Sequence, residues 1–227
     1  KDTITGLAAG VRLTSNDMLH KGDWITVKSV DANGIVEDMS LTTVKVRNFD
    51  NTIVTISPIT LVNGSFQNWI GMQKSGGRRV KRVVYFDFRS VRLVDEALKR
   101  NLLAKHFATE DSFKLKESLQ KAIDKDMQEG KDIEDLKNPA ALAPTNLQLY
   151  RKFMEKYLRQ RPEVNTDLTL MVRHMEATQC GLPIEFYFFI KDKVWVNYEH
   201  ILADIMEHAY ALANEFGLKI YEQYPEQ

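Results

Sequence analysis

The chain has 227 residues, of which 44% are hydrophobic and 27% charged, an ordinary composition for a globular protein. Basic and acidic residues number 31 each, so the formal net charge is zero, which argues against a nucleic-acid-binding protein because these usually carry a basic excess. The single cysteine excludes a disulfide within the chain and a zinc site built from several cysteines, and the sequence contains no apolar run of about 18 residues that could span a membrane.

Residues 1–20 are predicted to contain a helix that is apolar on two sides. One stripe at helical spacing consists of Ile4, Leu7, Ala8 and Val11. A second stripe consists of Gly6, Ala9, Gly10 and Leu13, most of them small residues that let backbones approach closely. Such a helix needs cover on both sides. Because it has no preceding cap and no initiating Met, we expect it to be the end of a helix from a larger membrane protein.

Residues 21–74 are predicted to form short strands at about 24–30, 35–37, 43–47 and 53–56. Asn33-Gly34 is a strong turn signal, and Gly34 is expected to adopt the left-handed conformation there. Trp24 and Trp69 are expected to be core or interface aromatics. Several short strands at close spacing are typical of a small β-barrel.

From residue 75 onward the pattern changes to longer strands and amphipathic helices, and 75–77 is a plausible hinge. Strands are predicted at 80–88, 168–176, 184–190 and about 218–223, with helices at 91–107 and 198–216. The order β-α-β-β-α-β is typical of a ferredoxin-like α+β domain. Residues 109–162 are charge-rich and mostly helical, and are predicted to be an insertion in that domain.

Several motifs, in this order, resemble the small-conductance mechanosensitive channel family, MscS. They are the small-residue run 6–11, Gly22-Asp23-Trp24-Ile25, Gly34-Ile35-Val36, the segment 42–51, and Phe66-Gln67-Asn68-Trp69. The segments 47–52, 76–82, 170–173 and 181–185 are similar to the YbdG-like branch of that family. The resemblance implies an α+β fold in three parts: the end of a pore-lining helix (1–20), an Sm-like β-barrel (21–74), and a ferredoxin-like domain (75–227) with a helical insert at about 109–162.

The resemblance also implies a function, that of the cytoplasmic cage of a tension-gated ion channel that releases solutes on osmotic downshock. The intact protein is then expected in the bacterial inner membrane as a homo-oligomer, a heptamer in that family. Its other partners would be the lipid bilayer, reached through helices upstream of this chain, and permeating ions and small solutes. No catalytic residue, cofactor, metal ion or nucleic acid is expected.

Three groups of residues are assigned on this resemblance. Pore-helix packing is assigned to Gly6, Leu7, Ala8, Ala9, Gly10 and Val11. The barrel motif is assigned to Gly22, Asp23, Trp24, Gly34, Val36, Arg47 and Asn68. A strand shared between subunits is assigned to Leu218, Ile220 and Tyr221. The small residues of the helix could permit sliding between helices or only static packing. The insert could adjust side openings, bind a partner, or be a passive surface excursion.

Two other functions stay open on the residues alone. An RNA-binding or interaction protein is one, because Sm-like and ferredoxin-like domains occur in RNA-binding proteins. Arg78, Arg79, Lys81 and Arg82 could meet phosphates, although charges that protect an edge strand explain this cluster more simply. A soluble enzyme is the other, because His200, Asp204 and His208 are spaced to share one helix face and could bind a divalent metal, although a solvated stripe explains them as well.

Overall fold

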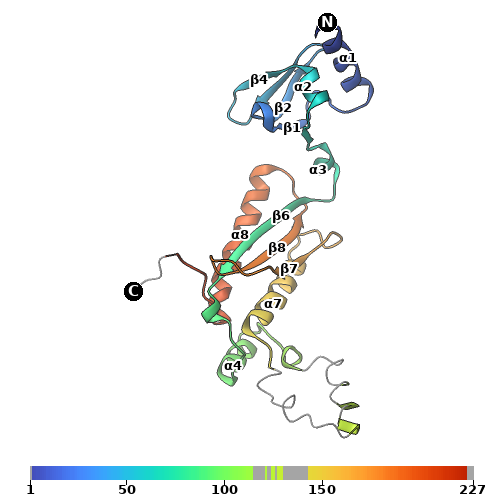
Figure 1. Ribbon diagram of the computed structural model, residues 1–227. Helices are drawn as coiled ribbons and strands as arrows, with labels where there is room; N and C mark the ends of the chain where they lie inside the picture. The colour runs from blue at the N-terminus through green and yellow to red at the C-terminus, as the bar shows by residue number, and fades with distance from the viewer. Residues whose placement is uncertain (1, 115–120, 122–123, 126, 130–142, 224–227) are drawn as a thin grey trace. The chain divides into compact units, whose positions relative to one another are not determined.

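The computed structural model describes residues 2–114, 121, 124–125, 127–129 and 143–223 (Figure 1). It divides the chain into two compact units: Lys1–Ser75, here called the β unit, and Gly76–Gln227, here called the α+β unit. Each unit combines helices with antiparallel strands, which confirms the predicted α+β class. Among the described residues, no helix is both long and apolar enough to cross a bilayer.

The β unit is built on a five-stranded antiparallel sheet with the strand order β4-β3-β2-β1-β5. The strands are β1 (Trp24–Val27), β2 (Ala32–Met39), β3 (Val44–Asn48), β4 (Ile53–Ile56) and β5 (Gln67–Asn68). The helices are α1 (Asp2–Ser15), α2 (Pro58–Asn63) and α3 (Ile70–Lys74), with a 3-10 turn, η1, at Lys28–Val30. Alternate strand residues such as Ile25, Val36 and Val46 are buried, and they form one core with Leu13 of α1 and Leu61 of α2.

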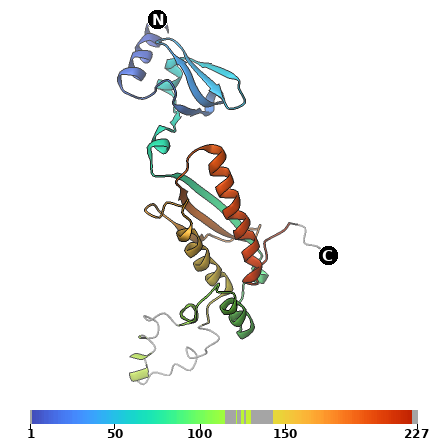
Figure 2. The ribbon, with the colours of Figure 1, turned by 180° about the vertical axis from the view of Figure 1, so that it is seen from behind.

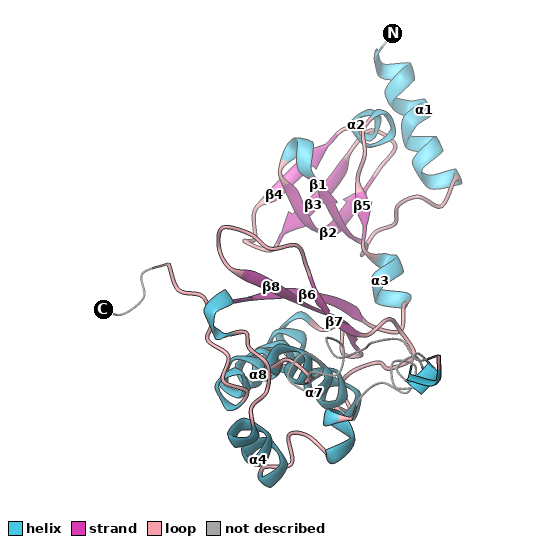
Figure 3. Cartoon of the chain, turned by 60° about the horizontal axis from the view of Figure 1, so that its bottom comes forward, coloured by secondary structure: helices cyan, strands magenta, loops and turns pink. Residues whose placement is uncertain are grey.

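The α+β unit is built on a three-stranded sheet with the order β6-β8-β7, in which neighbouring strands are antiparallel. The strands are β6 (Arg78–Phe86), β7 (Met171–His174) and β8 (Leu182–Ile190). The helices are α4 (Glu96–Ala104), α7 (Asn146–Gln160) and α8 (Trp195–Glu215), with 3-10 turns η2 (Phe88–Ser90) and η3 (Glu110–Phe113). Figure 3 shows these helices on one face of the sheet, and in Figure 2 α8 crosses in front of the strands.

The segment after α8 joins the sheet at the open edge of β6. Ile220 forms an antiparallel bridge with Phe86. The Asp87 N–H donates to the Lys219 carbonyl at 2.9 Å, and the Tyr221 N–H donates to the Tyr85 carbonyl at 2.8 Å. This pairing places the final segment beside β6, the position that the fourth strand takes in a ferredoxin-like sheet. The predicted strand at 218–223 is therefore limited here to a single bridge, and residues 224–227 lie outside the described residues.

Part of the range 109–162, which was expected to be a helical insertion, belongs to the core of the α+β unit, and residues 115–120, 122–123, 126 and 130–142 lie outside the described residues. Helix α7 lies within that range, and its residues Tyr150, Met154 and Leu158 are completely buried in the core. The Tyr150 hydroxyl donates to the Ala209 carbonyl of α8 at 2.6 Å. Lys152 and Lys156 occupy the exposed side of the same helix. A helix with one charged face can still fill a core with its other face, so the charge content alone misled the prediction.

Asn146, the first residue of α7, is completely buried and satisfied by four hydrogen bonds. Its amide nitrogen donates to the carbonyls of Ser90 (2.9 Å) and Phe216 (3.1 Å). Its amide oxygen accepts from the backbone N–H groups of Arg92 (3.0 Å) and Leu147 (2.9 Å). One side chain thus holds together the turn after β6, the start of α7 and the end of α8.

Candidate functional site

Helix α1 presents two chemically different faces. Ala9, Gly10 and Leu13 are buried against the rest of the β unit, and Figure 1 shows α1 beside α2. On the other face, 75% of Ile4 and 52% of Val11 are exposed. Of the two predicted stripes, the chain itself therefore covers only the one that contains Gly10. The stripe of Ile4, Leu7, Ala8 and Val11 is an apolar surface without cover among the described residues.

The two glycines of α1 have different surroundings. A Cβ atom placed on Gly10 would lie 2.1 Å from the carbonyl oxygen of Leu41, in the turn between β2 and β3. A Cβ atom placed on Gly6 would meet nothing within 4 Å. The Thr14 hydroxyl also donates to the Gly10 carbonyl at 3.0 Å. Gly10 is thus required by close backbone packing, whereas Gly6 lies on an open side of the helix.

A tight turn connects α1 to β1. Asp17 adopts the left-handed conformation with φ 58°, and the Met18 N–H donates back to the Leu13 carbonyl at 3.2 Å, which ends the helix. Leu19 is then completely buried. Gly22 has φ 93°, a conformation that favours glycine, and its N–H donates to the Val36 carbonyl. Residues 16–23, which connect α1 to β1, are thus attached by hydrogen bonds to α1 and to β2.

Asp23 and Asn68 hold this turn in place. Asp23 is 6% exposed, and its Oδ2 accepts from the His20 N–H at 3.0 Å and from the Asn68 Nδ2 at 2.8 Å. The same Asn68 nitrogen also donates to the Met18 carbonyl at 3.3 Å. The His20 ring lies 2.8 Å from Asp17 Oδ1. Two residues assigned from the motif are thus brought together, and they join the end of α1 to β1 and β5.

Gly34 corrects one expectation from the sequence. It lies inside β2, where it is paired with Ile25 and Asn48, and not in a turn. A Cβ atom at Gly34 would lie 1.9 Å from the Arg47 carbonyl oxygen, so glycine is needed there for close approach of β2 and β3. The turn before β2 is made instead by η1 and Asp31, which has φ 52°. The Arg47 side chain reaches across to Glu37 at 2.5 Å.

An aromatic cluster occupies the face of the sheet opposite to the core. The Trp24 and Trp69 rings are stacked with centroids 4.7 Å apart, and Phe49 meets Trp24 edge-on at 5.3 Å. The Trp69 Nε1 donates to the Thr26 hydroxyl at 2.9 Å, and the Trp24 Nε1 donates to Asn33 Oδ1 at 3.0 Å. Both tryptophans are only partly buried, so they belong to the surface of this unit.

The three residues assigned to a strand between subunits make contacts within the α+β unit. Leu218 is 1% exposed and belongs to its core, while Ile220 and Tyr221 pair with β6. These contacts use the backbone on one side of the segment. A strand shared between subunits stays a prediction.

The residues behind the two other functions have structural partners. The Arg78 guanidinium lies 4.2 Å from the ring centre of Tyr198. His208 stacks on Tyr157 of α7, with ring centres 5.8 Å apart. Within the described part of the chain, no group of three or more metal-binding side chains is present. These contacts are typical of packing in the α+β unit and point to neither function.

One buried carboxylate was not singled out by the sequence. Glu185 is completely buried at the centre of β8, and its Oε2 accepts from Arg173 Nε of β7 at 2.5 Å. Lys81 of β6 lies 3.7 Å from the other oxygen. The bond from Arg173 is the main cause that lowers the pKa of Glu185, although burial acts in the opposite direction. Glu185 thereby links all three strands through charge.

Comparison with known proteins shows that the β unit is similar to part of mechanosensitive ion channels. Residues 2–71 match the family model described as the mechanosensitive ion channel β-domain. Over 68 residues the chain is 32% identical to the small-conductance mechanosensitive channel MscMJ of Methanocaldococcus jannaschii, which is 30% of this chain and 19% of that protein. It is 33% identical over 108 residues to an uncharacterized MscS family protein of Aquifex aeolicus, which is 47% of this chain and 28% of the relative. The matches thus span less than a third of these relatives.

Similar solved structures extend the likeness to the whole chain at the level of the fold. The structure of MSL1 from Arabidopsis thaliana superposes with a TM-score of 0.63 and 11% identity, over 98% of this chain and 60% of that one. The closed-state structure of MscS from Helicobacter pylori superposes with a TM-score of 0.59 and 13% identity, over 100% of this chain and 65% of that one.

Proposed function

We propose that this chain is the part of an MscS-type mechanosensitive ion channel that follows its pore-lining helix, because residues 2–71 match the family model of the mechanosensitive ion channel β-domain. In this proposal α1 is the end of that helix, and the β unit and the α+β unit form the cytoplasmic cage. The channel opens under membrane tension and releases ions and small solutes on osmotic downshock. It is a homoheptamer of the YbdG-like branch in the bacterial inner membrane, with upstream helices in contact with the lipid.

One observation carries this proposal, the division of α1 into a covered and an uncovered face. The covered face, with Gly10 against Leu41, attaches the helix to the β unit. The uncovered apolar face, with Ile4 and Val11 more than half exposed, has the composition of a surface that packs on other helices. Tension gating needs two such packings that differ in their area in the membrane, so that tension shifts their populations.

The proposal is tested with the full-length gene product in a bacterial host that lacks its own mechanosensitive channels. Patch-clamp recording should show a stretch-activated current, and the cells should survive osmotic downshock better than cells with an empty vector. Val11→Asn should change the tension threshold, because it places an amide on the uncovered apolar face. Thr55→Asn, at an exposed position of β4, is the matched control and should leave the threshold unchanged. Absence of any stretch-activated current in membranes that contain the protein would reject the proposal.

The subunit number has a separate test. The purified protein is expected to give a mass of seven copies by native mass spectrometry. A ring of another size would reject the heptamer. The channel assignment itself is tested separately by the patch-clamp recordings.

A further inference from the structure

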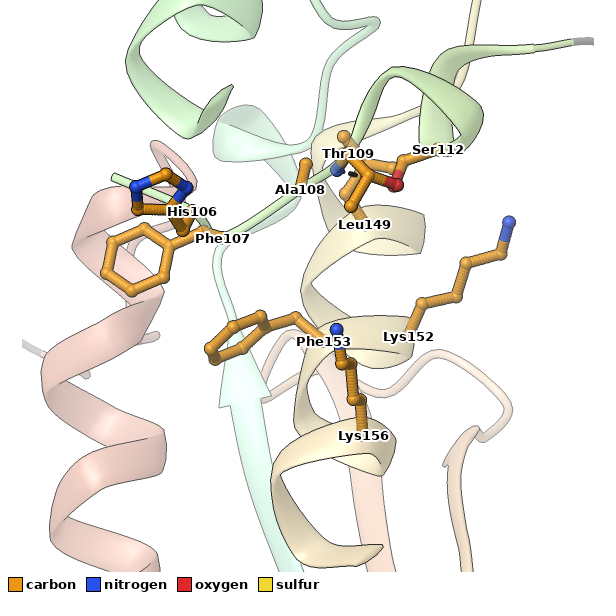
Figure 4. A pocket seen from close by; sticks show the side chains of 9 residues that line it. All are labelled: His106, Phe107, Ala108, Thr109, Ser112, Leu149, Lys152, Phe153 and Lys156. Atoms are coloured by element: carbon orange, nitrogen blue, oxygen red, sulfur yellow. Dashed lines mark hydrogen bonds between the residues drawn. The ribbon is translucent and has the colours of Figure 1, made fainter. Parts of the chain in front are cut away.

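A small cavity of about 150 Å³ lies in the α+β unit between α7 and the segment that follows α4 (Figure 4). Phe107 and Phe153 form its apolar part, with their rings edge-to-face and their centres 5.2 Å apart. Thr109 and Ser112 line it from the segment before and within η3. This cavity is outside the site described above, and neither the family motifs nor the proposed function uses it.

The charged part of the lining is entirely basic. Lys152 and Lys156 stand one turn apart on α7, and Figure 4 shows both side chains extending toward the end of the helix where Thr109 and Ser112 lie. Residue His106 also lines the cavity, and no carboxylate does. An anion in this cavity would therefore be lined by two ammonium groups and by no carboxylate.

These two lysines differ from the lysines around them. Nearby on the same unit, Lys99, Lys105 and Lys114 each have a carboxylate within 4.0 Å. In contrast, the structure records no acidic partner for Lys152 or Lys156 among the described residues. Like charges one helical turn apart destabilise a helix slightly, and a bound anion would remove that cost.

The hydroxyl groups supply hydrogen bonds at the same place. The Thr109 N–H donates to Ser112 Oγ at 3.1 Å, and the Ser112 N–H donates to the Thr109 carbonyl at 2.8 Å. The Thr109 and Ser112 hydroxyls lie 3.3 Å apart. This short turn holds the two hydroxyls close together in the cavity lining, and each keeps capacity for one more hydrogen-bond partner.

We infer that this cavity binds a small organic phosphate monoester, with its phosphate held by Lys152, Lys156 and the two hydroxyls and its apolar group against Phe107 and Phe153. A phosphate monoester carries close to two negative charges at pH 7, which matches the two ammonium groups. It also offers several acceptor oxygens to the lysines and hydroxyls. The inference does not depend on the channel assignment, because it rests on the α+β unit alone.

The test is isothermal titration calorimetry of the full 227-residue chain with phenyl phosphate, inorganic phosphate and phenol in separate titrations. Phenyl phosphate should bind most tightly, and its affinity should fall with added salt. The double variant Lys152→Gln/Lys156→Gln should bind it at least about tenfold more weakly, since each charge-assisted hydrogen bond contributes more than about 1 kcal/mol. The matched control is Arg159→Gln, on the exposed side of the same helix and outside the cavity lining, which should leave the affinity within about twofold.

Three results would overturn the inference. If phenyl phosphate binds the double variant as tightly as the wild type, the two lysines do not contribute to binding. Phenol that binds as tightly as phenyl phosphate would show an apolar cavity with no use for the anion. Inorganic phosphate that binds as tightly as phenyl phosphate would show an inorganic anion site and reject the organic ligand. Thermal unfolding of each variant checks that the substitutions leave the fold intact.

Discussion

The packing of α1 against the rest of the β unit predicts that a glycine-to-alanine substitution has opposite effects on stability at two positions of this helix, Gly10 and Gly6. In Gly10→Ala the new Cβ atom would lie 2.1 Å from the Leu41 carbonyl oxygen, whereas real Cβ contacts are essentially never shorter than 3.0 Å. The atoms it meets are backbone atoms, which cannot rotate away. In Gly6→Ala the new atom would meet nothing within 4 Å. The chain thus contains its own matched control.

The magnitudes follow from this geometry. Helix and turn must separate by about 0.9 Å at Gly10, the difference between 2.1 and 3.0 Å, and overpacking of this kind costs about 1–3 kcal/mol. Replacing glycine by alanine in a helix interior gains about 1 kcal/mol at either position. We therefore expect Gly10→Ala to lose about 1 kcal/mol net and Gly6→Ala to gain up to about 1 kcal/mol. For a unit of this size, the difference corresponds to about 8–16 °C in melting temperature.

The assay is unfolding of the 227-residue chain in urea, followed by tryptophan fluorescence. Of its three tryptophans, Trp24 and Trp69 lie in the β unit, so a Trp195→Phe background makes the signal report that unit alone. The midpoint should move down for Gly10→Ala and up for Gly6→Ala. Equal shifts in the same direction would refute the view that Gly10 is held by backbone contact.

Three further predictions concern other parts of the chain. Glu185→Gln should destabilise the protein by about 1–3 kcal/mol at pH 7. The bond from Arg173 places the folded-state pKa of Glu185 below its unfolded value of about 4.3, so this stabilisation is present above that value and is lost as the pH falls through the folded-state pKa. The gap between the urea midpoints of wild type and variant should therefore shrink as the pH falls below about 4.3, and a gap that widens with falling pH would contradict the assignment. Asn146→Ala should cost about 2–4 kcal/mol in the same assay, because it leaves two buried carbonyls and two N–H groups without their partner; a loss below about 1 kcal/mol would count against that role. In the full-length protein, Ala9→Leu should change the tension threshold in patch-clamp recordings, because Ala9 is buried where α1 meets the β unit, whereas exposed Ala211→Leu on α8 should leave it unaltered.

The sequence predicted the two stripes of α1 but not which of them is covered. Helical periodicity places Ala9 and Leu13 on one side and Ile4 and Val11 on another, and the structure agrees with that division. The partner of Gly10 is the backbone of Leu41, 31 positions along the chain. A contact that involves only backbone atoms depends on no particular side chain, so no local pattern in the sequence could indicate it.

The strands and the last helix were predicted well because their apolar periodicity is regular, as in β8 and α8. The prediction that Gly34 adopts a left-handed turn conformation was wrong. The Asn-Gly rule describes an isolated hairpin, whereas here the close contact between β2 and β3 is what requires glycine at this position. Residues 109–162 were predicted to be mostly helical, as α7 is, but the place of α7 in the core was not predicted. Its charges were given more weight than the regular spacing of Tyr150, Met154 and Leu158. Asn146 follows Thr145, which caps α7, and this capping signal was available in the sequence. The three distant partners of Asn146, which are Ser90, Arg92 and Phe216, could not be predicted from it.

The contact between Gly10 and Leu41 has a mechanical consequence. This contact is formed by two backbones, so it contains no side chain that could rotate and absorb a displacement of the helix. A pull along α1 is therefore delivered to the hairpin of β2 and β3 as strain, with little loss at the junction. The hairpin shares such a load with α2, which also packs on α1.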